Sequence, residues 1–316
     1  MNKLLYYIEK DAWEDIFIDL SKRHKTFAPC LDDSQIKYKQ ISTKDKNAIY
    51  TNPTRLTTPI KHFFFPPFEK NSSEIKLLYG IKACDLNALI FFDKKNLTSD
   101  KAALNYKSKR ENTIIISTDC TNIKESCFCL LLGKTPFPQE GFDINISFAK
   151  EGFIIELGSE RGANLLKHHE KHLYPLDQSH LKSKDLNRLQ VIQKLKDNNT
   201  KHKTSQDLSK AISGHEKSQS WKNLAKNCLN CAACRNICPT CNFFVTEQDK
   251  NNTNQKQQTY HKCTNKNLSI FDKFKNRFYC KFEYHQTLSC TGCGRCIEAC
   301  PNNIDIREIL AKFARA

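Results

Sequence analysis

The sequence predicts an α/β amino-terminal domain followed by a mainly helical domain that is rich in cysteine. Short apolar segments that suit strands lie in the first half of the chain, together with an amphipathic helix, and a repeated cysteine pattern lies in the last third. The 316 residues, 39% of them hydrophobic, leave room for two globular domains. We assign the α/β domain to residues 1–175, a basic helical connector to 176–220 and the cysteine-rich domain to 221–316.

The α/β prediction depends on one helix and several strands. Helical spacing predicts an opening amphipathic helix with its apolar stripe at Trp13, Ile16, Phe17 and Leu20. Candidate strands follow at residues 76–81, 113–117, 142–149 and 153–157, and the last two are expected to form a hairpin. Within that hairpin, apolar residues alternate with Asn145 and Ser147, which predicts one solvated face.

Two later segments have helical periodicity. In the connector, Lys and Arg outnumber Asp and Glu, and apolar residues recur at Leu186, Leu189, Ile192 and Leu195. A closing helix is expected to present Ile306, Ile309, Leu310 and Phe313 on one face. Between these segments, the polar run at residues 249–259 predicts a solvent loop.

Eight of the sixteen cysteines form two copies of one spacing. The copies are Cys228-x2-Cys231-x2-Cys234-x3-Cys238-Pro239 and Cys290-x2-Cys293-x2-Cys296-x3-Cys300-Pro301. This is the ligand run of bacterial ferredoxins, in which the fourth cysteine of each run ligates the other cluster. We therefore predict two [4Fe-4S] clusters, held by Cys228, Cys231, Cys234 and Cys300 and by Cys238, Cys290, Cys293 and Cys296. The wide gap between the runs favours a helical two-cluster ferredoxin-type domain that forms part of a larger assembly.

Other uses of these cysteines are weaker. Structural zinc prefers two separated cysteine pairs, whereas both runs here are complete and end before proline. A disulfide framework is disfavoured because the chain lacks a secretory signal, so we expect a reducing, cytoplasmic compartment. No apolar stretch approaches the roughly 20 residues that a membrane span needs.

The net charge of +16 raises nucleic-acid binding as an alternative function. Two clusters with four thiolates each contribute about −4 and reduce the total to about +12. No helix-turn-helix, zinc-finger or RNP-type motif accompanies the charge. We therefore expect no nucleic-acid partner, and keep a basic zinc protein that binds nucleic acid as the alternative of another class.

A second set of cysteines lies in the α/β region. Cys84 follows the strand at 76–81, Cys120 follows the strand at 113–117, and Cys127 and Cys129 come soon afterwards. Loops at strand ends are where α/β folds place their sites, and four cysteines suit an iron–sulfur centre. A third centre is one hypothesis, with Asp85 as an extra ligand or a group behind the ligands. The alternative is that these cysteines are small buried hydrophobes.

Nothing in the sequence predicts a catalytic group. No Ser-His-Asp or Cys-His arrangement can be recognised from spacing, and no G-x-G-x-x-G motif exists for a flavin or nicotinamide. An enzyme working at the Cys84–Cys129 cysteines is the alternative hypothesis. Packing is the expected role of the four cysteines without an assigned partner, Cys30, Cys241, Cys263 and Cys280.

Several stretches together resemble a known family. They are Gly80 to Asp85, Asp119-Cys120, Cys127-Phe128-Cys129, Gly141-Phe142-Asp143, Cys238-Pro239-Thr240-Cys241, Lys281-Phe282-Glu283-Tyr284 and Gly292-Cys293-Gly294-Arg295-Cys296. This order is similar to that of the beta (iron–sulfur) subunit of cytoplasmic sulfhydrogenase-type nickel–iron hydrogenases and of the related A subunit of anaerobic sulfite reductase. One departure is Ala232, which stands where the family usually has glycine.

The resemblance implies an accessory electron-transfer subunit without a catalytic site of its own. Such a subunit relays electrons between a flavin/NAD(P)H subunit and a nickel–iron hydrogenase catalytic subunit. The equivalent subunit of an anaerobic sulfite reductase is the alternative, because the nickel site or sirohaem sits in another chain in either case.

Overall fold

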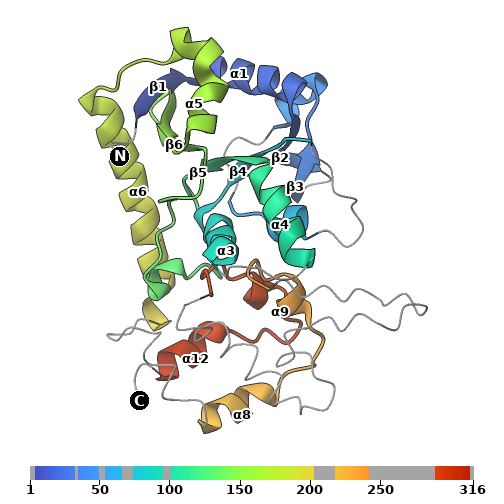
Figure 1. The fold of residues 1–316 in the computed structure, drawn as a ribbon. Helices are drawn as coiled ribbons and strands as arrows, with labels where there is room; N and C mark the ends of the chain where they lie inside the picture. The colour runs from blue at the N-terminus through green and yellow to red at the C-terminus, as the bar shows by residue number, and fades with distance from the viewer. Residues whose placement is uncertain are drawn as a thin grey trace, which may run out of the picture.

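A seven-stranded mixed sheet forms the centre of the amino-terminal region (Figure 1). The computed structural model describes residues 4–32, 35–49, 54–65, 74–94, 101–202, 218–241 and 289–313. In spatial order the strands are β1 (Leu5–Glu9), β7 (Gly152–Leu157), β6 (Ile144–Ala149), β5 (Thr113–Thr118), β4 (Lys76–Ile81), β2 (Lys25–Asp32) and β3 (Gln35–Gln40).

The four central strands of the sheet run parallel. β2, β4, β5 and β6 pair with one another in this sense, whereas β1, β7 and β3 are antiparallel to their neighbours. β4 and β5 are buried along their whole length, as expected for parallel strands covered on both faces. Because these two strands are adjacent and parallel, the loops after Ile81 and Thr118 leave the sheet at the same edge.

Helices cover both faces of the sheet. α1 (Lys10–Arg23) and α5 (Glu160–Leu166) pack on one face, where Trp13 and Phe17 meet Tyr79. α2 (Lys61–Phe64), α3 (Ala83–Lys94) and α4 (Lys101–Glu111) cover the other face, around Leu78 and Ile115. Full burial of a large apolar side chain contributes about 1.5–3 kcal/mol. These layers confirm the predicted α/β class, the opening helix and the hairpin.

The prediction of a solvated face on the hairpin was wrong. Asn145 and Ser147 are buried because α6 (Gln178–Asn198) packs against β6. The Asp119 carboxylate accepts hydrogen bonds from both residues, at 3.1 and 2.8 Å, and from Arg188 of α6 at 2.7 and 3.1 Å. The alternation of polar and apolar residues therefore reflects a buried polar network and not solvent.

The apolar pattern of α6 correctly predicted a helix, but not all of the apolar residues on which the prediction depended are buried. Leu195 is buried, together with Val191, whereas Leu186 and Leu189 are exposed. The helix starts at a capping box in which the Asp177 side chain accepts from the His180 amide at 2.8 Å. The boundaries of the proposed domains stay predictions.

The described part of the cysteine-rich region consists of short helices joined by loops, with no strand among its described residues. Its helices are α8 (Gln219–Ala225), α9 (Ala233–Asn236), α11 (Arg295–Glu298) and α12 (Ile306–Phe313). Trp221 and the buried face of α12 pack around Phe128, which comes from the amino-terminal region. The polar run at 249–259, Cys263 and Cys280 lie outside the described residues.

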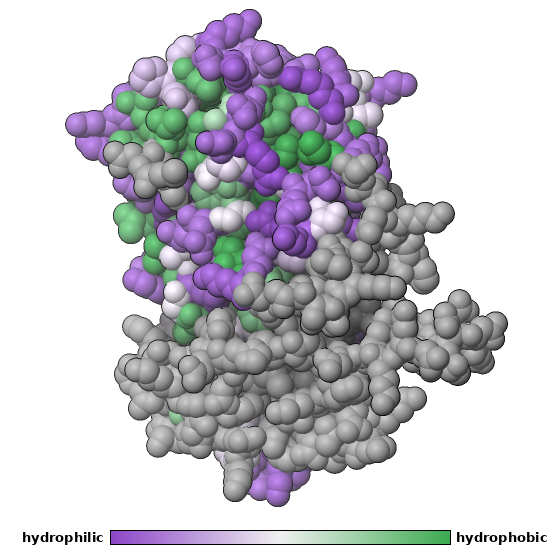
Figure 2. Space-filling view, viewed as in Figure 1, coloured by the Kyte–Doolittle hydropathy of each residue, from purple (hydrophilic) through white to green (hydrophobic). Residues whose placement is uncertain are grey.

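Short 3₁₀ helices complete the described secondary structure. They are η1 (Thr43–Ala48), η2 (Cys129–Leu132), η3 (Lys167–His172) and η4 (Thr200–His202). Figure 2 shows hydrophilic residues over much of the visible α/β surface, with apolar residues between them. Within the described part of the chain, no helix has both the length and the apolar character of a membrane span.

Asp143 gives a test of this fold. Its buried carboxylate accepts from the Ile115 amide at 2.8 Å, the Ser159 hydroxyl at 2.5 Å and Arg161 at 3.2 Å, so it joins β5 to the start of α5. We expect Asp143→Ala to lower the free energy of unfolding by about 1–3 kcal/mol, because a buried amide loses its acceptor. Anaerobic urea titration followed by circular dichroism measures the change. Glu151→Ala, in the exposed hairpin turn, should change it by less than about 0.5 kcal/mol.

Candidate iron–sulfur centres

The two cysteine runs fold into loops of the same backbone shape. Asn230 and Ala232 in the first loop have φ values of +55° and +61°, and the matching Gly292 and Gly294 have +65° and +72°. Each loop then leads into a short helix, α9 or α11, that carries the third cysteine of its run. Ala232 thus adopts a left-handed conformation that glycine reaches without a steric cost.

A backbone amide in the first loop points toward a cysteine sulfur. The Asn230 N–H donates to the Cys228 Sγ at 3.4 Å. Such amide donors orient thiolate ligands and tune the reduction potential of a bound cluster. The loop therefore fits an anionic sulfur ligand, which is the donor that an iron–sulfur cluster requires.

The cysteine at the end of the second run lies with the first run. Burial raises the pKa of the Cys228 thiol, and the Asn230 amide opposes this rise. The neighbouring groups that raise the pKa further are the thiols of Cys234, Cys300 and Cys231. Two residues after Cys300, the Asn302 side chain donates to the Asn227 carbonyl at 2.7 Å, so the end of the second run lies beside the start of the first, as the cross-ligation hypothesis requires.

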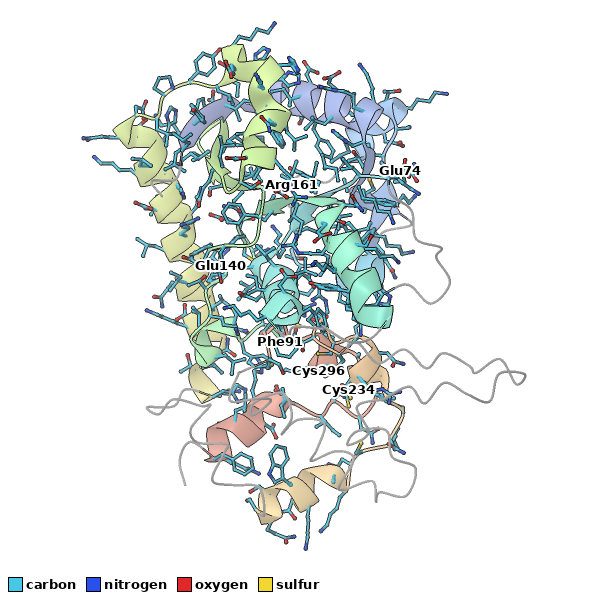
Figure 3. All side chains as sticks on the ribbon, viewed as in Figure 1. Glu74, Phe91, Glu140, Arg161, Cys234 and Cys296 are labelled. Atoms are coloured by element: carbon cyan, nitrogen blue, oxygen red, sulfur yellow. The ribbon has the colours of Figure 1, made fainter. Side chains whose placement is uncertain are left out.

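The two loops differ in exposure. Cys231 is exposed and Leu229 beside it is 63% exposed, whereas Cys290 and Cys293 are buried. Cys238 is also buried, with its Sγ 3.3 Å from the Thr240 hydroxyl. α9 and α11 pack against each other, and Figure 3 shows Cys234 and Cys296 in the same region, below α3. One loop thus faces outward and the other faces the α/β region.

The second loop is covered by residues 126–129 of the amino-terminal region. The Phe128 amide donates to the Gly292 carbonyl at 2.8 Å. A Cβ at Gly292 would lie 2.4 Å from the Cys129 Cα, and one at Gly294 would lie 2.0 Å from the Ser126 carbonyl oxygen. Glycine is therefore required at both positions by close packing as well as by backbone conformation.

A buried ion pair joins the second loop to α3. Arg295, between Cys293 and Cys296, donates to both carboxylate oxygens of Asp85 at 2.9 and 2.6 Å. Its Nε also donates to the Leu56 carbonyl at 2.9 Å. Both charged groups are buried, and Asp85 sits next to Cys84 in the first turn of α3. The Asp85 carboxylate is thus engaged by arginine, which favours a positioning role over direct ligation.

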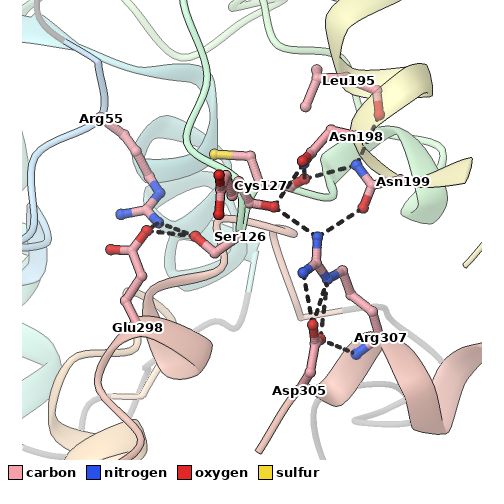
Figure 4. Close-up of polar contacts among 10 residues, drawn as sticks. Arg55, Ser126, Cys127, Leu195, Asn198, Asn199, Glu298, Asp305 and Arg307 are labelled. Carbon is pink, nitrogen blue, oxygen red and sulfur yellow. Dashed lines mark hydrogen bonds and ion pairs between the residues drawn. The ribbon is translucent and has the colours of Figure 1, made fainter. Parts of the chain in front are cut away.

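A second polar network links the same regions (Figure 4). Arg55 donates to the Ser126 hydroxyl at 2.8 Å and to Glu298 of α11 at 2.5 Å. Arg307, in the first turn of α12, donates to the Glu125 carbonyl at 2.7 Å. The 125–127 segment is therefore held on one side by Arg55 together with Glu298 of the second cysteine run, and on the other by Arg307, which follows that run.

The amino-terminal cysteines come together beside this segment. Cys129 lies in an apolar cluster with Val191 and Leu195, against which Cys120 and Cys127 also pack. Cys84 lies at the start of α3, and the neighbouring charges that raise the pKa of its buried thiol include Cys293 and Cys120. The structure therefore gathers all four sequence-predicted thiols next to the second loop.

Buried cationic groups surround these thiols. Burial raises the pKa of the Cys120 thiol to about 11, and Lys82 opposes the rise. Lys82 is itself buried and donates to the Asp119 carbonyl at 2.9 Å. Burial would lower the pKa of Arg55, but the thiols of Cys293 and Cys127 raise it above its ordinary value. Sequence reasoning missed the roles of both cations, because Arg55 belongs to no motif and Lys82, although it lies in the Gly80 to Asp85 stretch, was not considered separately there.

The thiols are not arranged around a point. Among the residues that the structure describes, no three His, Cys, Asp or Glu side chains gather so as to hold a single metal ion. A cubane instead places iron at four separate corners, so its thiolates surround a volume. The case for a cluster over mononuclear zinc therefore stays with the cysteine pattern, in which each run has four cysteines and ends before proline.

Residues 227–304 match the model of the 4Fe-4S dicluster domain. Together with the paired loops, this match defines an iron–sulfur protein of the electron-transfer class that carries two [4Fe-4S] clusters. In an alignment 330 positions long, the chain is 24% identical to Sulfhydrogenase 2 subunit beta of Pyrococcus furiosus, and the alignment covers 96% of each chain. This similarity confirms the resemblance to the sulfhydrogenase beta-subunit family.

The remaining cysteines are placed differently. Cys30 is buried in β2 within the main apolar core, where burial raises the pKa of its thiol. Cys241 follows the first run, and its carbonyl accepts from the Lys61 ammonium at 2.7 Å. Neither observation calls for a metal at these two positions, and both stay assigned to packing.

The packing of the second loop gives a matched test. We expect Gly294→Ala to remove the spectroscopic signal of the second cluster, because the added methyl group collides with the Ser126 carbonyl. Ala232→Gly changes the equivalent position of the first loop and should leave both clusters intact. Electron paramagnetic resonance of the reduced protein distinguishes the two variants. Two intact clusters in Gly294→Ala would contradict the close approach of Ser126.

Proposed function

We propose that this chain is the electron-transfer subunit of a redox complex, with Cys228, Cys231, Cys234 and Cys300 as ligands of one cluster and Cys238, Cys290, Cys293 and Cys296 as ligands of the other. The observation that carries the proposal is the pairing of two loops of one shape, with the Cys300 end of the second run hydrogen-bonded to the start of the first through Asn302 and Asn227. When bound, the [4Fe-4S] clusters supply one-electron exchange.

The residues of the chain hold and shield the clusters. Packing of α9 on α11 keeps the two ligand sets adjacent. Phe128, Trp221 and Phe313 exclude water from the cysteine-rich core, and the Asn230 amide donates to a ligand sulfur. Burial and such hydrogen bonds are the means by which a protein sets cluster potentials.

The exposed first loop is the proposed contact point for a redox partner. Cys231 and Leu229 reach the surface, whereas the second loop is covered by residues 126–129. An exposed apolar side chain beside a ligand is suited to docking another protein. Electrons would therefore enter or leave through the first cluster and move inward to the second.

The proposed partners are a flavin/NAD(P)H subunit and a nickel–iron hydrogenase catalytic subunit. The similarity to Sulfhydrogenase 2 subunit beta extends over nearly the whole chain and supports this assignment. It favours a hydrogenase partner over the sulfite reductase alternative, in which the electron-transfer role of this chain would be the same.

Purification of the native complex tests the partner assignment. An affinity tag on this chain should capture a complex that oxidises hydrogen with an artificial electron acceptor and that reduces the clusters of this chain from NAD(P)H. Sulfite-dependent oxidation of a reduced dye by the captured complex, with no hydrogen oxidation, would support the sulfite reductase partner. Replacement of Leu229 by Glu should weaken the partner contact, whereas Leu186→Glu, the same change at an exposed apolar residue of α6, serves as a control.

Cross-ligation is tested with two serine variants. We expect Cys300→Ser to alter the cluster held by the first run, because its thiol lies with Cys228, and Cys238→Ser to alter the cluster held by the second run. Potentiometric titration followed by electron paramagnetic resonance identifies which signal changes. A Cys300→Ser protein in which only the second-run signal is lost would show that the ligand assignment is wrong.

A further inference from the structure

The four amino-terminal thiols form a site that the two-cluster function does not use. We propose that Cys84, Cys120, Cys127 and Cys129 ligate a third iron–sulfur centre, placed next to the second cluster. The proposal rests on the electron-transfer function proposed above, since its role is to accept and return electrons within the same chain.

The topology of the sheet brings these ligands together. β4 and β5 are parallel neighbours, so Cys84 and Cys120 leave the sheet at one edge, each within three residues of a strand end. The 126–129 segment turns back toward this edge, where the Cys127 carbonyl accepts from Asn199 at 2.8 Å and the Cys120 amide donates to the Pro136 carbonyl at 3.2 Å. Three separate loops thus supply four thiols.

The site has the shell of an iron–sulfur centre. Cys120, Cys127 and Cys129 pack in one apolar cluster with Phe137, Val191 and Leu195. The Cys127 Sγ is 4.0 Å from the Cys293 carbonyl oxygen, so the site adjoins a ligand of the second cluster. An apolar surround and a short separation from a second centre are the conditions for electron exchange between buried clusters.

Charge favours an anionic group among these thiols. Arg55, Lys82 and Arg295 are all buried there, and burial of a charged group is costly unless opposite charge is near. Asp85 and Glu298 compensate Arg295 and Arg55 in part. Metal coordination deprotonates a thiol, so four coordinated cysteines would place net negative charge beside these cations.

Unpartnered donors give a second and independent indication. Arg55 is 3% exposed, yet its Nε and Nη1 have no hydrogen-bond partner among the described residues. The same holds for the buried Thr118 hydroxyl, two residues before Cys120, and for the Thr291 hydroxyl in the second loop. A buried polar group without a partner costs about 1–3 kcal/mol. Sulfur atoms of a bound cluster would supply acceptors at this place.

Simple packing explains these cysteines less well. Cys30 shows the packing role, because it is buried among aliphatic and aromatic residues of the main core. The amino-terminal set instead combines four thiols with buried cations.

In the proposed step, one electron passes from the reduced second cluster to the third centre. The second cluster is thereby oxidised and the third centre reduced, and no covalent bond changes.

Iron content of the full-length protein, purified anaerobically and reconstituted, tests the proposal. Two cubanes account for about eight iron atoms, and a third centre raises this to about ten for two irons or about twelve for four. We expect Cys120→Ser and Cys127→Ser to lose that increment and its signal while keeping both dicluster signals. Cys30→Ser, a buried cysteine outside the site, should lose nothing.

The outcomes separate the inference from the proposed function. If the wild-type protein contains about eight iron atoms per chain, and Cys120→Ser contains the same number, the third centre is overturned. The proposed electron-transfer function would then be unaffected. Protein without iron after reconstitution overturns the proposed function itself. Circular dichroism of each variant identifies a folding defect, and the Arg55 variants then decide the question.

The charge of Arg55 allows a further test, because it should change the reduction potential of the third centre. Cysteines with a purely structural role would give no such potential. Removal of the positive charge in Arg55→Met should lower the reduction potential of the third centre, because the reduced state carries one more negative charge. Arg55→Lys keeps the charge and should restore most of the shift. An additional signal that responds in this order supports the centre, whereas potentials that are identical in wild type, Arg55→Met and Arg55→Lys overturn it.

Discussion

The buried ion pair between Arg295 and Asp85 is the constraint on which the arrangement of the cysteine loops depends. It fixes the second loop against the first turn of α3. Both side chains are buried, so their charges are paired inside the protein. A buried pair contributes little net stability, but loss of one partner leaves an uncompensated charge that costs about 3–5 kcal/mol. Its effect is therefore to specify one geometry, in which the amino-terminal region and the cluster loops are one structure.

The close contact of backbones follows from this arrangement. With Arg295 drawn toward α3, the second loop lies so near residues 126–129 that only glycine fits at positions 292 and 294. Asp119 has a similar role on the other side, because it ties the loop that carries Cys120 to β6 and to α6. Two carboxylates, each next to a cysteine in sequence, thus orient the cysteine-bearing loops.

Sequence patterns predicted the local features well and the contacts poorly. The spacing of eight cysteines and the apolar periodicity of α1 are local, so they indicated the two-cluster domain and the opening helix. Sequence analysis did not identify β1, which pairs with the distant strand β7, or the hairpin of β2 and β3, whose segments contain a proline and several charged residues. It also assigned Asn145 and Ser147 to solvent, since nothing local shows that α6 covers them. Arg55 belongs to no sequence motif. Its contacts with Ser126 and Glu298, and its position near the thiols, are seen only in the folded structure.

The difference in solvent exposure between the two cysteine loops affects how the protein is damaged by oxygen. Cysteine and cluster sulfur are attacked where oxidants can reach them, and Cys231 is exposed whereas Cys290 and Cys293 are buried. The outward loop is thus the vulnerable end of the chain of centres. With the proposed partner contact at the first loop, brief exposure to oxygen would damage that contact before the interior centre, so a sample that is still brown would no longer exchange electrons.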